Sequence, residues 1–183
     1  MARKETITQT DILHAAFAML KEEGYENVTA RKLAAKAGCS TQPIFRIYHG
    51  MDELWEDLFE MAVSCFEIFY GEFPEKSDIP FVNLGLAYIS FAEENKNIFR
   101  LLFLSEDRHG KSLYDLLNGR NGAVIREINK AKEYGCKSPE NLFMQMWILI
   151  HGAACMSLTG DYDLAEGETV TLLEKACRSF TAE

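Results

Sequence analysis

Apolar positions recur with helical spacing along most of the chain. Ile12 is followed by Ala15, Ala16 and Met19 at distances of three, four and seven residues. This spacing places all four side chains on one face of a helix. Segments with the same spacing follow one another, separated by turns rich in glycine and polar residues. The pattern predicts about nine helices, over residues 8–23, 30–37, 41–48, 51–70, 80–93, 96–104, 112–134, 139–159 and 167–180.

Residue types at the expected helix ends support these boundaries. Thr29 and Ser40 suit the N-caps of the helices that follow them, and Gly38 suits the end of the helix before it. Pro139 falls in the first turn of its helix, where its missing N–H has no intrahelical partner in any case. The glycines of "NGRNG", residues 118–122, should kink or split the helix that contains them. Only four prolines occur and β-branched runs are scarce, so we expect an all-α fold.

The segment "GEFPEKSDIP", residues 71–80, is the clearest linker in the chain. It follows the long helix expected at 51–70 and precedes a larger group of helices. We therefore divide the chain into a domain at residues 1–50 and a second domain at residues 51–183, with the helix at 51–70 connecting them.

Charge is distributed unevenly between these two parts. The net charge of −9 alone argues against nucleic acid as a partner. Residues 1–50, however, hold seven Lys and Arg against five Asp and Glu, whereas residues 51–183 hold twelve against twenty-three. The first part can therefore approach a polyanion that the second part would repel.

Cysteine usage and hydropathy bear on where the protein works. The five cysteines include no C-x-x-C pair, which favours a reduced protein, and the polar start of the chain does not resemble a signal peptide, so we expect a cytoplasmic location. Residues 141–160 carry no formal charge and are long enough to span a membrane, but their polar side chains favour a helix buried between other helices. A redox role for one thiol and a membrane span are the alternatives.

Residues 30–48 have the pattern of a helix-turn-helix. Ala34 and Gly38 allow two helices to cross closely, and Gly38 also permits a left-handed turn between them. The apolar positions that would bury this pair are Leu33, Ala37, Cys39, Ile44 and Ile47. The remaining face of the second helix holds Ser40, Thr41, Gln42, Phe45 and Arg46. Hydrogen-bonding groups, an aromatic ring and a cation on one face suit a DNA major groove, whereas an ordinary helical hairpin with a polar face is the alternative.

Residues 8–54 resemble the DNA-binding domain of the TetR family of transcriptional regulators. The resemblance lies in Phe17, Gly24, Tyr25, Thr29, Leu33, Ala34, Ala37, Gly38, Ser40, Phe45, Tyr48 and Leu54. It implies an N-terminal three-helix helix-turn-helix domain followed by a C-terminal helical domain for ligand binding and dimerisation. It also implies a homodimer that binds double-stranded operator DNA, with an affinity that changes when a small-molecule effector binds.

The chain departs from the family's pattern at three points. Gln42-Pro43 stands where the family usually has Gly-Thr, Phe45 where it often has tyrosine, and Met51 where it commonly has lysine. Loss of the hydroxyl group and of the cation should weaken phosphate contacts. Gln42 can compensate by reading adenine N6 and N7, and Phe45 can contact a thymine methyl group.

Further side chains are expected to reach phosphates beside this helix. The candidates are Thr29, Arg31, Arg46 and Tyr48. The backbone at residues 49–52 offers N–H groups at a helix start, and we expect His49 to be a cap or a backbone neighbour rather than a base reader. Lys32 and Lys36 either contact phosphates or are simply solvated.

The second domain is rich in large apolar side chains that could surround a cavity between helices. The candidate ligand-binding residues are Phe66, Phe69, Tyr70, Phe91, Phe99, Phe103, Met144, Trp147 and His151. Ordinary core is the alternative for each of them, because aromatic side chains at helical spacing usually pack in a core. His151 and Cys155 have the spacing of metal ligands, but no further ligand accompanies them, so we expect neither a metal nor a cofactor.

The helices at 139–159 and 167–180 carry more apolar surface than one protomer hides easily. The candidate dimer-interface residues are Gly152, Ala153, Leu172, Leu173, Ala176 and Phe180. Two such helices from each protomer would form a four-helix interface.

Taken together, the patterns predict a ligand-responsive DNA-binding transcriptional regulator, a repressor released from its operator by a small apolar or aromatic molecule. The sequence lacks G-x-S-x-G, H-E-x-x-H and Gly-rich phosphate-loop motifs, so we do not expect an enzyme. The alternatives are a DNA-binding regulator controlled by a protein partner and a small helical enzyme.

Overall fold

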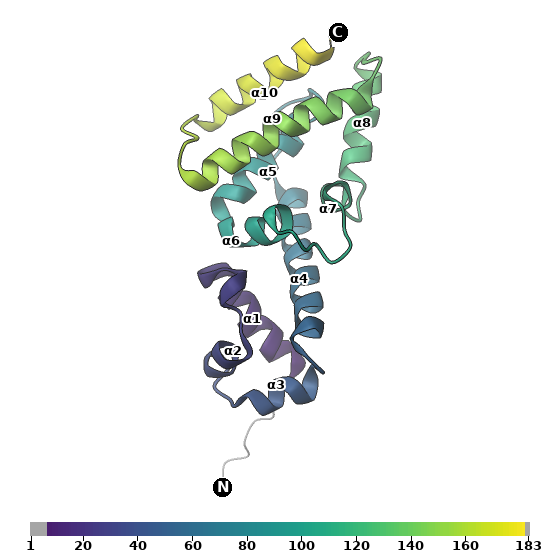
Figure 1. Cartoon of the computed structure of the whole chain (residues 1–183). Helices are drawn as coiled ribbons and strands as arrows, with labels where there is room; N and C mark the ends of the chain where they lie inside the picture. Colours follow the sequence, from purple (N-terminus) through teal and green to yellow (C-terminus); the bar gives the residue numbers. More distant parts are fainter. Residues whose placement is uncertain (1–6, 182–183) are drawn as a thin grey trace. The chain divides into compact units, whose positions relative to one another are not determined.

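The computed structural model describes residues 7–181, and every regular element in this range is a helix (Figure 1). The elements are α1 (Gln9–Glu23), η1 (Tyr25–Asn27), α2 (Ala30–Lys36), α3 (Thr41–Ile47), α4 (Met51–Glu72), α5 (Val82–Glu94), α6 (Lys96–Phe99), η2 (Arg100–Leu104), α7 (Leu113–Asn118), α8 (Ala123–Glu133), α9 (Pro139–Thr159) and α10 (Glu166–Thr181). The predicted all-α fold is confirmed.

Local hydrogen bonds define both ends of α1. The Thr8 hydroxyl accepts a hydrogen bond from the Asp11 N–H at 3.2 Å, and the Asp11 carboxylate accepts one from the Thr8 N–H at 2.9 Å, which completes a capping box. The hydrogen bonds from the hydroxyl and the N–H of Thr8 hold the pKa of Asp11 below its ordinary value. At the other end, Gly24 has a φ of +86° and its N–H donates to the Leu20 carbonyl at 3.1 Å. This conformation explains why a glycine ends the helix.

Two of the predicted helices are interrupted. The helix predicted at 112–134 divides into α7 and α8 around Gly119 and Gly122, which have φ values of +53° and +65°. The helix predicted at 96–104 begins as the short α6 and continues as η2, a π-helical turn. Such a turn changes the phase of the side chains that follow it, and a sequence period read at 3.6 residues does not reveal it.

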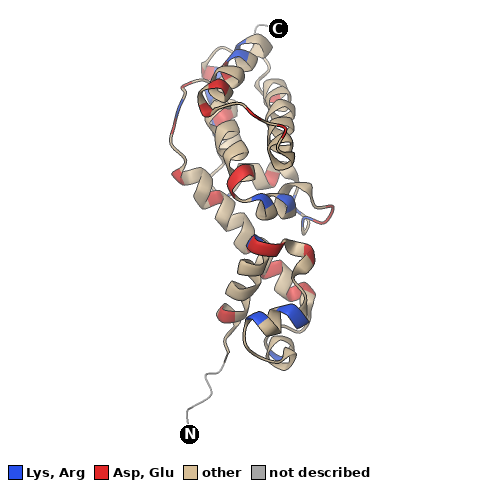
Figure 2. Ribbon diagram, turned by 90° about the vertical axis from the view of Figure 1, so that its left-hand side faces the viewer, with Lys and Arg blue, Asp and Glu red and all other residues tan. Residues whose placement is uncertain are grey.

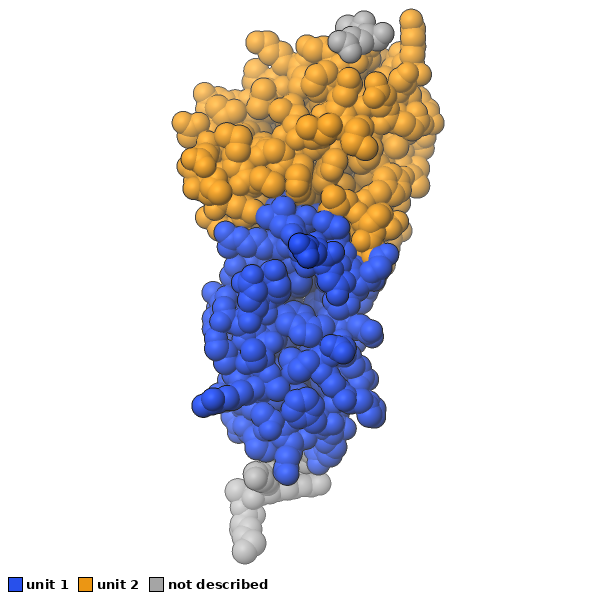
Figure 3. Space-filling view, in the orientation of Figure 1, with its two compact units in different colours: residues 1–65, 97–110 blue, residues 66–96, 111–183 orange. Residues whose placement is uncertain are grey.

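The chain divides into two compact units (Figure 3). Unit 1 contains residues 1–65 and 97–110, and unit 2 contains residues 66–96 and 111–183. The predicted domains at 1–50 and 51–183 stay a prediction. The long helix α4 contributes residues to both units.

Helix α5 is the centre of the core of unit 2. Nine of its thirteen residues are buried, and α9 and α10 pack against it. The three helices come close together at Gly85, where a Cβ atom would lie 2.8 Å from Ile150 Cδ1 and 3.0 Å from Leu173 Cδ1. The absence of a side chain at Gly85 therefore sets how closely the three helices pack.

Helix α9 is long and apolar enough to cross a membrane, and it is the one such helix within residues 7–181. One face of it packs against α5, α8 and α10, with Leu142, Met146, Ile150 and Ala154 buried. The opposite face is exposed at Met144, Ile148 and Met156, so α9 packs against other helices on one side and is not buried between them as the sequence predicted.

A buried carboxylate supports the start of α5. Glu127 of α8 is 8% exposed and accepts a hydrogen bond from the Phe81 N–H. Phe81 precedes α5 with a φ of +64°, a conformation that is uncommon for a residue other than glycine. Burial raises the pKa of the Glu127 carboxyl group. The hydrogen bond therefore offsets some of the cost of a left-handed residue at a helix start.

Replacement of Gly85 by alanine should destabilise unit 2. The added methyl group meets Ile150 and Leu173 at less than van der Waals distance, so we expect the free energy of unfolding to fall by about 1–3 kcal/mol despite the better helix propensity of alanine. Gly71→Ala in α4 is the matched control, because no atom lies within 4 Å of its added Cβ. Urea denaturation of both variants measures the difference, and equal stability of the two would contradict the close approach.

Candidate nucleic-acid interface

Helices α2 and α3 are joined by a tight turn at residues 37–40. Gly38 adopts a φ of +67°, and the Cys39 N–H donates to the Ala34 carbonyl at 2.9 Å, which closes the end of α2. Leu33 and Ile44 are fully buried where the two helices meet, and Ala34 is buried beside them. The turn and the small residue at the crossing are those predicted for a helix-turn-helix.

Helix α3 presents its other face to solvent. Gln42, Phe45 and Arg46 are exposed, with Phe45 49% exposed, while Ile44 between them is fully buried. Ser40 occupies the N-cap position with extended backbone, but its side chain makes no capping hydrogen bond, contrary to the cap expected from the sequence. The Ser40 hydroxyl group is exposed beside Thr41, which is half-buried. The predicted face is therefore present as one surface.

Tyr48 lies on the opposite side of this region. Its side chain is 0% exposed, and its hydroxyl group donates to Asp57 Oδ2 at 3.1 Å. Burial, together with the Asp57 carboxylate, raises the pKa of Tyr48 to about 12. This position argues against the phosphate contact that the sequence predicted for Tyr48, because its hydroxyl group is engaged within the protein.

The start of α2 and the start of α4 flank α3. Thr29 caps α2 by accepting a hydrogen bond from the Lys32 N–H at 3.4 Å, and Arg31 is exposed beside it. The N–H of His49 donates to Glu53 Oε2 at 2.7 Å, and its Nδ1 lies 3.0 Å from the same oxygen. The hydrogen bond from this N–H is the main cause that lowers the pKa of Glu53. His49 is thus tied to a carboxylate, and its N–H is not available to a phosphate.

Acidic residues of α1 hold the two lysines of α2. Lys32 Nζ lies 3.5 Å from Glu23 Oε2, and Lys36 Nζ forms an ion pair with Glu22. Arg31 and Arg46, in contrast, make no ion pair within residues 7–181. Figure 2 shows the Lys and Arg positions of the ribbon in blue and the Asp and Glu positions in red. The two arginines are the cations best able to meet DNA phosphates without first breaking an internal contact.

The candidate ligand residues occupy several environments. In unit 2, Phe91 is fully buried and its ring contacts Phe66 and Phe69, with centroids 5.0 and 5.3 Å apart. Trp147 stacks on His151 at 5.3 Å, and both are half-buried. Among the other candidates, Tyr70 is half-buried and Met144 is 51% exposed, whereas Phe99 and Phe103 are buried in unit 1 with ring centroids 5.0 Å apart.

Two aromatic residues that the sequence reasoning missed join these groups. Tyr88 contacts Phe66 at 6.2 Å and Trp147 at 4.9 Å, and its hydroxyl group is 3.0 Å from His151 Nδ1. Phe143 stacks on Trp147 at 6.4 Å. The sequence spacing could have indicated both residues, because Tyr88 lies three residues before Phe91 and Phe143 lies four residues before Trp147, which places each pair on one helix face.

The candidate dimer residues also divide by burial. Leu173 is 0% exposed and packs beside Gly85, and Ala153 is buried as well, so both contribute to the core of unit 2. Gly152 is exposed, while Leu172, Ala176 and Phe180 are half-buried. The exposed apolar side chains of α9 are Met144, Ile148 and Met156. Within the described part of the chain, no group of three or more His, Cys, Asp or Glu side chains is placed to hold a metal ion.

The fold and the exposed face of α3 define a helix-turn-helix DNA-binding protein. Residues 12–58 match the sequence model of the bacterial regulatory proteins of the tetR family, and residues 81–180 match that of the Tetracyclin repressor-like C-terminal domain. The second match alone covers more than half of the chain. The chain belongs to the TetR family of transcriptional regulators, whose members bind DNA and are not enzymes.

Solved structures support the same fold. A protein from Vibrio parahaemolyticus named as a TetR-family transcriptional regulator is 20% identical, with a TM-score of 0.63 over 93% of this chain and 96% of that chain. Another, from Rhodococcus sp., is 17% identical, with a TM-score of 0.60 over 94% and 97%. A third, from Mesorhizobium loti, is 18% identical, with a TM-score of 0.52 over 94% of both chains. Among curated proteins there is no significant match.

Substitutions on α3 should separate phosphate contact from base reading. Against an operator selected from random duplexes, Arg46→Ala should weaken binding to all sequences and reduce the slope of log affinity against log salt by about one. Gln42→Ala should instead relax preference at one base position by about 1–3 kcal/mol. Lys137→Ala, which removes an exposed cation of unit 2, is the control and should leave the salt slope unchanged. Gel-shift titrations measure all three, and an equal loss of salt dependence in Lys137→Ala and Arg46→Ala would show that the face is assigned wrongly.

Proposed function

We propose that the protein is a homodimeric repressor, released from its operator by a small apolar or aromatic molecule. The exposed face of α3 carries this proposal, because it presents an amide, an aromatic ring and a guanidinium that makes no ion pair within residues 7–181. A bacterial regulator of this kind works where the chromosome is, so we place it in the cytoplasm.

Helix α3 enters the major groove in this proposal. Gln42 reads a base edge, Phe45 contacts a thymine methyl group, and Arg46 meets a phosphate. The other DNA contacts are made by Thr29, Arg31, Ser40 and Thr41. His49 supports the start of α4 through Glu53, and Tyr48 supports α3 from inside the protein.

The effector binds in unit 2 beside Trp147 and His151. These side chains are stacked and half-buried, so each retains surface that an aromatic molecule can cover. His151 offers a polar contact whose orientation is fixed by the Tyr88 hydroxyl group at 3.0 Å. Phe66, Phe69 and Phe91 support this group from the core, while a role for Tyr70, Phe99, Phe103 and Met144 stays a prediction.

Helix α4 transmits the effect of the ligand. It begins three residues after Tyr48 and runs without interruption to Glu72, so one helix contributes to both compact units. A shift of this helix changes the separation of the two reading heads in a dimer. The effector acts by binding the non-DNA state more tightly, and a hundredfold preference corresponds to about 2.7 kcal/mol.

The dimer interface lies on the exposed stripe of α9 and on the adjoining α10. Met144, Ile148 and Met156 are spaced four and eight residues apart, with Gly152 between them, and so form a continuous line on α9. An apolar stripe of this kind is typical of a protein-protein interface. Leu172, Ala176 and Phe180 of α10 retain exposed area that a partner can cover.

Ile148→Glu should therefore convert the dimer to a monomer. Ile148 is 66% exposed, so the substitution leaves the core of the protomer intact but places an unpaired carboxylate in the interface. Ile125→Glu on α8, where the side chain is 48% exposed, is the matched control and should remain dimeric. Light scattering at micromolar concentration decides the matter. A wild-type protein that is already monomeric would contradict the proposal, as would a dimeric Ile148→Glu variant.

An effector beside Trp147 should change its fluorescence. In a Trp55→Phe variant, where Trp147 is the remaining tryptophan, compounds that release operator DNA should quench the emission. His151→Ala should weaken this response, whereas Tyr134→Phe, on an exposed residue of unit 2, should not. Compounds that release DNA but leave Trp147 emission unchanged would place the effector elsewhere. Release by no compound would favour control by a protein partner.

A further inference from the structure

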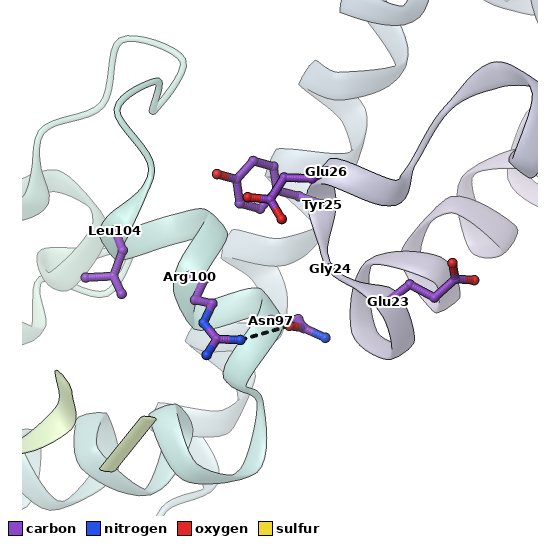
Figure 4. Close-up of a pocket in the computed structure, with 7 residues that line it drawn as sticks. All are labelled: Glu23, Gly24, Tyr25, Glu26, Asn97, Arg100 and Leu104. Carbon is purple, nitrogen blue, oxygen red and sulfur yellow. Dashed lines mark hydrogen bonds between the residues drawn. The ribbon is translucent and has the colours of Figure 1, made fainter. Parts of the chain in front are cut away.

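A pocket lies entirely within unit 1, at the C-terminal end of α1 (Figure 4). Residues of α1 and η1 line one side of it, and residues of α6 and η2 line the other. Its volume is about 310 Å³, within the range of small-molecule sites. The effector residues beside Trp147 belong to unit 2, so this pocket is separate from them.

Asn97 holds the two sides of this pocket together. Its Nδ2 donates to the Lys21 carbonyl at 2.9 Å, and a Cβ atom on Gly24 would lie 3.6 Å from its Oδ1. Because Gly24 also requires its positive φ, the backbone at this point has little room to move. The pocket is therefore formed before a ligand arrives, which lowers the cost of binding.

The two sides of the pocket differ in charge. One side has the carboxylate of Glu26 and the C-terminal end of α1, which carries partial negative charge, whereas the Glu23 carboxylate points away from the pocket (Figure 4). The other side has Arg100, whose Nη1 is 3.5 Å from Asn97 Oδ1 and which makes no ion pair within residues 7–181. The π-helical turn η2 begins at Arg100 and ends at Leu104, so both of its ends face the same pocket.

We propose that this pocket binds a free α-amino acid with an apolar side chain. The ligand carboxylate pairs with the Arg100 guanidinium, which suits a planar bidentate partner. The ligand ammonium group faces Glu26 and the end of α1. Its side chain packs against Tyr25 and Leu104, which supply the apolar part of the lining. A simple anion or a simple cation would satisfy only one of the two sides.

Calorimetry of the full-length protein with L-leucine tests the ligand class. We expect L-leucine to bind with a Kd below about 1 mM. N-acetyl-L-leucine, which lacks the cation, and L-leucinamide, which lacks the anion, should each bind at least about tenfold more weakly. Equal binding of the three compounds would overturn recognition of both charges. Failure of every standard free amino acid to bind at millimolar concentration would overturn the site.

Variants test the residues of the pocket. Arg100→Gln and Glu26→Gln should each weaken L-leucine binding at least about tenfold, while Lys96→Gln, on the exposed start of α6, should not. Unchanged L-leucine binding in Arg100→Gln and Glu26→Gln would overturn the assignment of the two charges to this pocket.

Discussion

The carboxylate of Asp57 joins three helices of unit 1. Its Oδ2 accepts one hydrogen bond from Gln9 of α1 at 2.9 Å and another from Tyr48, at the end of α3, at 3.1 Å, while Asp57 itself belongs to α4. Because Tyr48 directly follows α3, this contact sets the direction of the helix that presents Gln42 and Arg46. Without the carboxylate, the buried Tyr48 hydroxyl group would lose its partner, which costs about 1–3 kcal/mol. The position of the exposed α3 face therefore depends on a polar contact inside the protein.

Internal ion pairs restrain the cations around this face unequally. Lys32 and Lys36 lie against carboxylates of α1, so a phosphate must displace Glu23 or Glu22 before it gains their charge. Exposed pairs of this kind are worth only about 0–1 kcal/mol, so the exchange is inexpensive. Arg31 and Arg46 face no such competition within residues 7–181. The number of phosphates that the protein neutralises therefore depends on whether Lys32 and Lys36 stay paired with Glu23 and Glu22. In this way the acidic residues of α1 influence DNA binding although they carry the same charge as DNA.

The sequence predicted the helices and the face of α3 because both follow from local rules. Apolar spacing located α1, α4 and α9, and Gly38 located the turn. Tyr48 could not be placed in the same way, since an aromatic ring with a hydroxyl group suits either a core or a phosphate and only the position of Asp57 decides between them. Leu173 presented a similar choice, because an apolar stripe on α10 gives no indication of whether α5 or a second protomer covers it. The π-helical turn η2 escaped prediction because its winding departs from the period by which helices are recognised.

The energy that an effector must supply limits how it can act. To raise the population of the DNA-releasing state from about 1% to about 99%, the effector must bind that state about 5.5 kcal/mol more tightly than the DNA-binding state. One stacked aromatic pair contributes about 0.5–1.5 kcal/mol beyond the area that it buries, so stacking on Trp147 is not enough alone. Covering about 150 Å² of apolar surface adds about 4 kcal/mol at about 25 cal/mol per Å². An effector beside Trp147 and His151 therefore reaches the required difference only if this surface is covered in one state and exposed in the other. The half-buried condition of both side chains leaves surface for that change, whereas the fully buried Phe91 behind them leaves none.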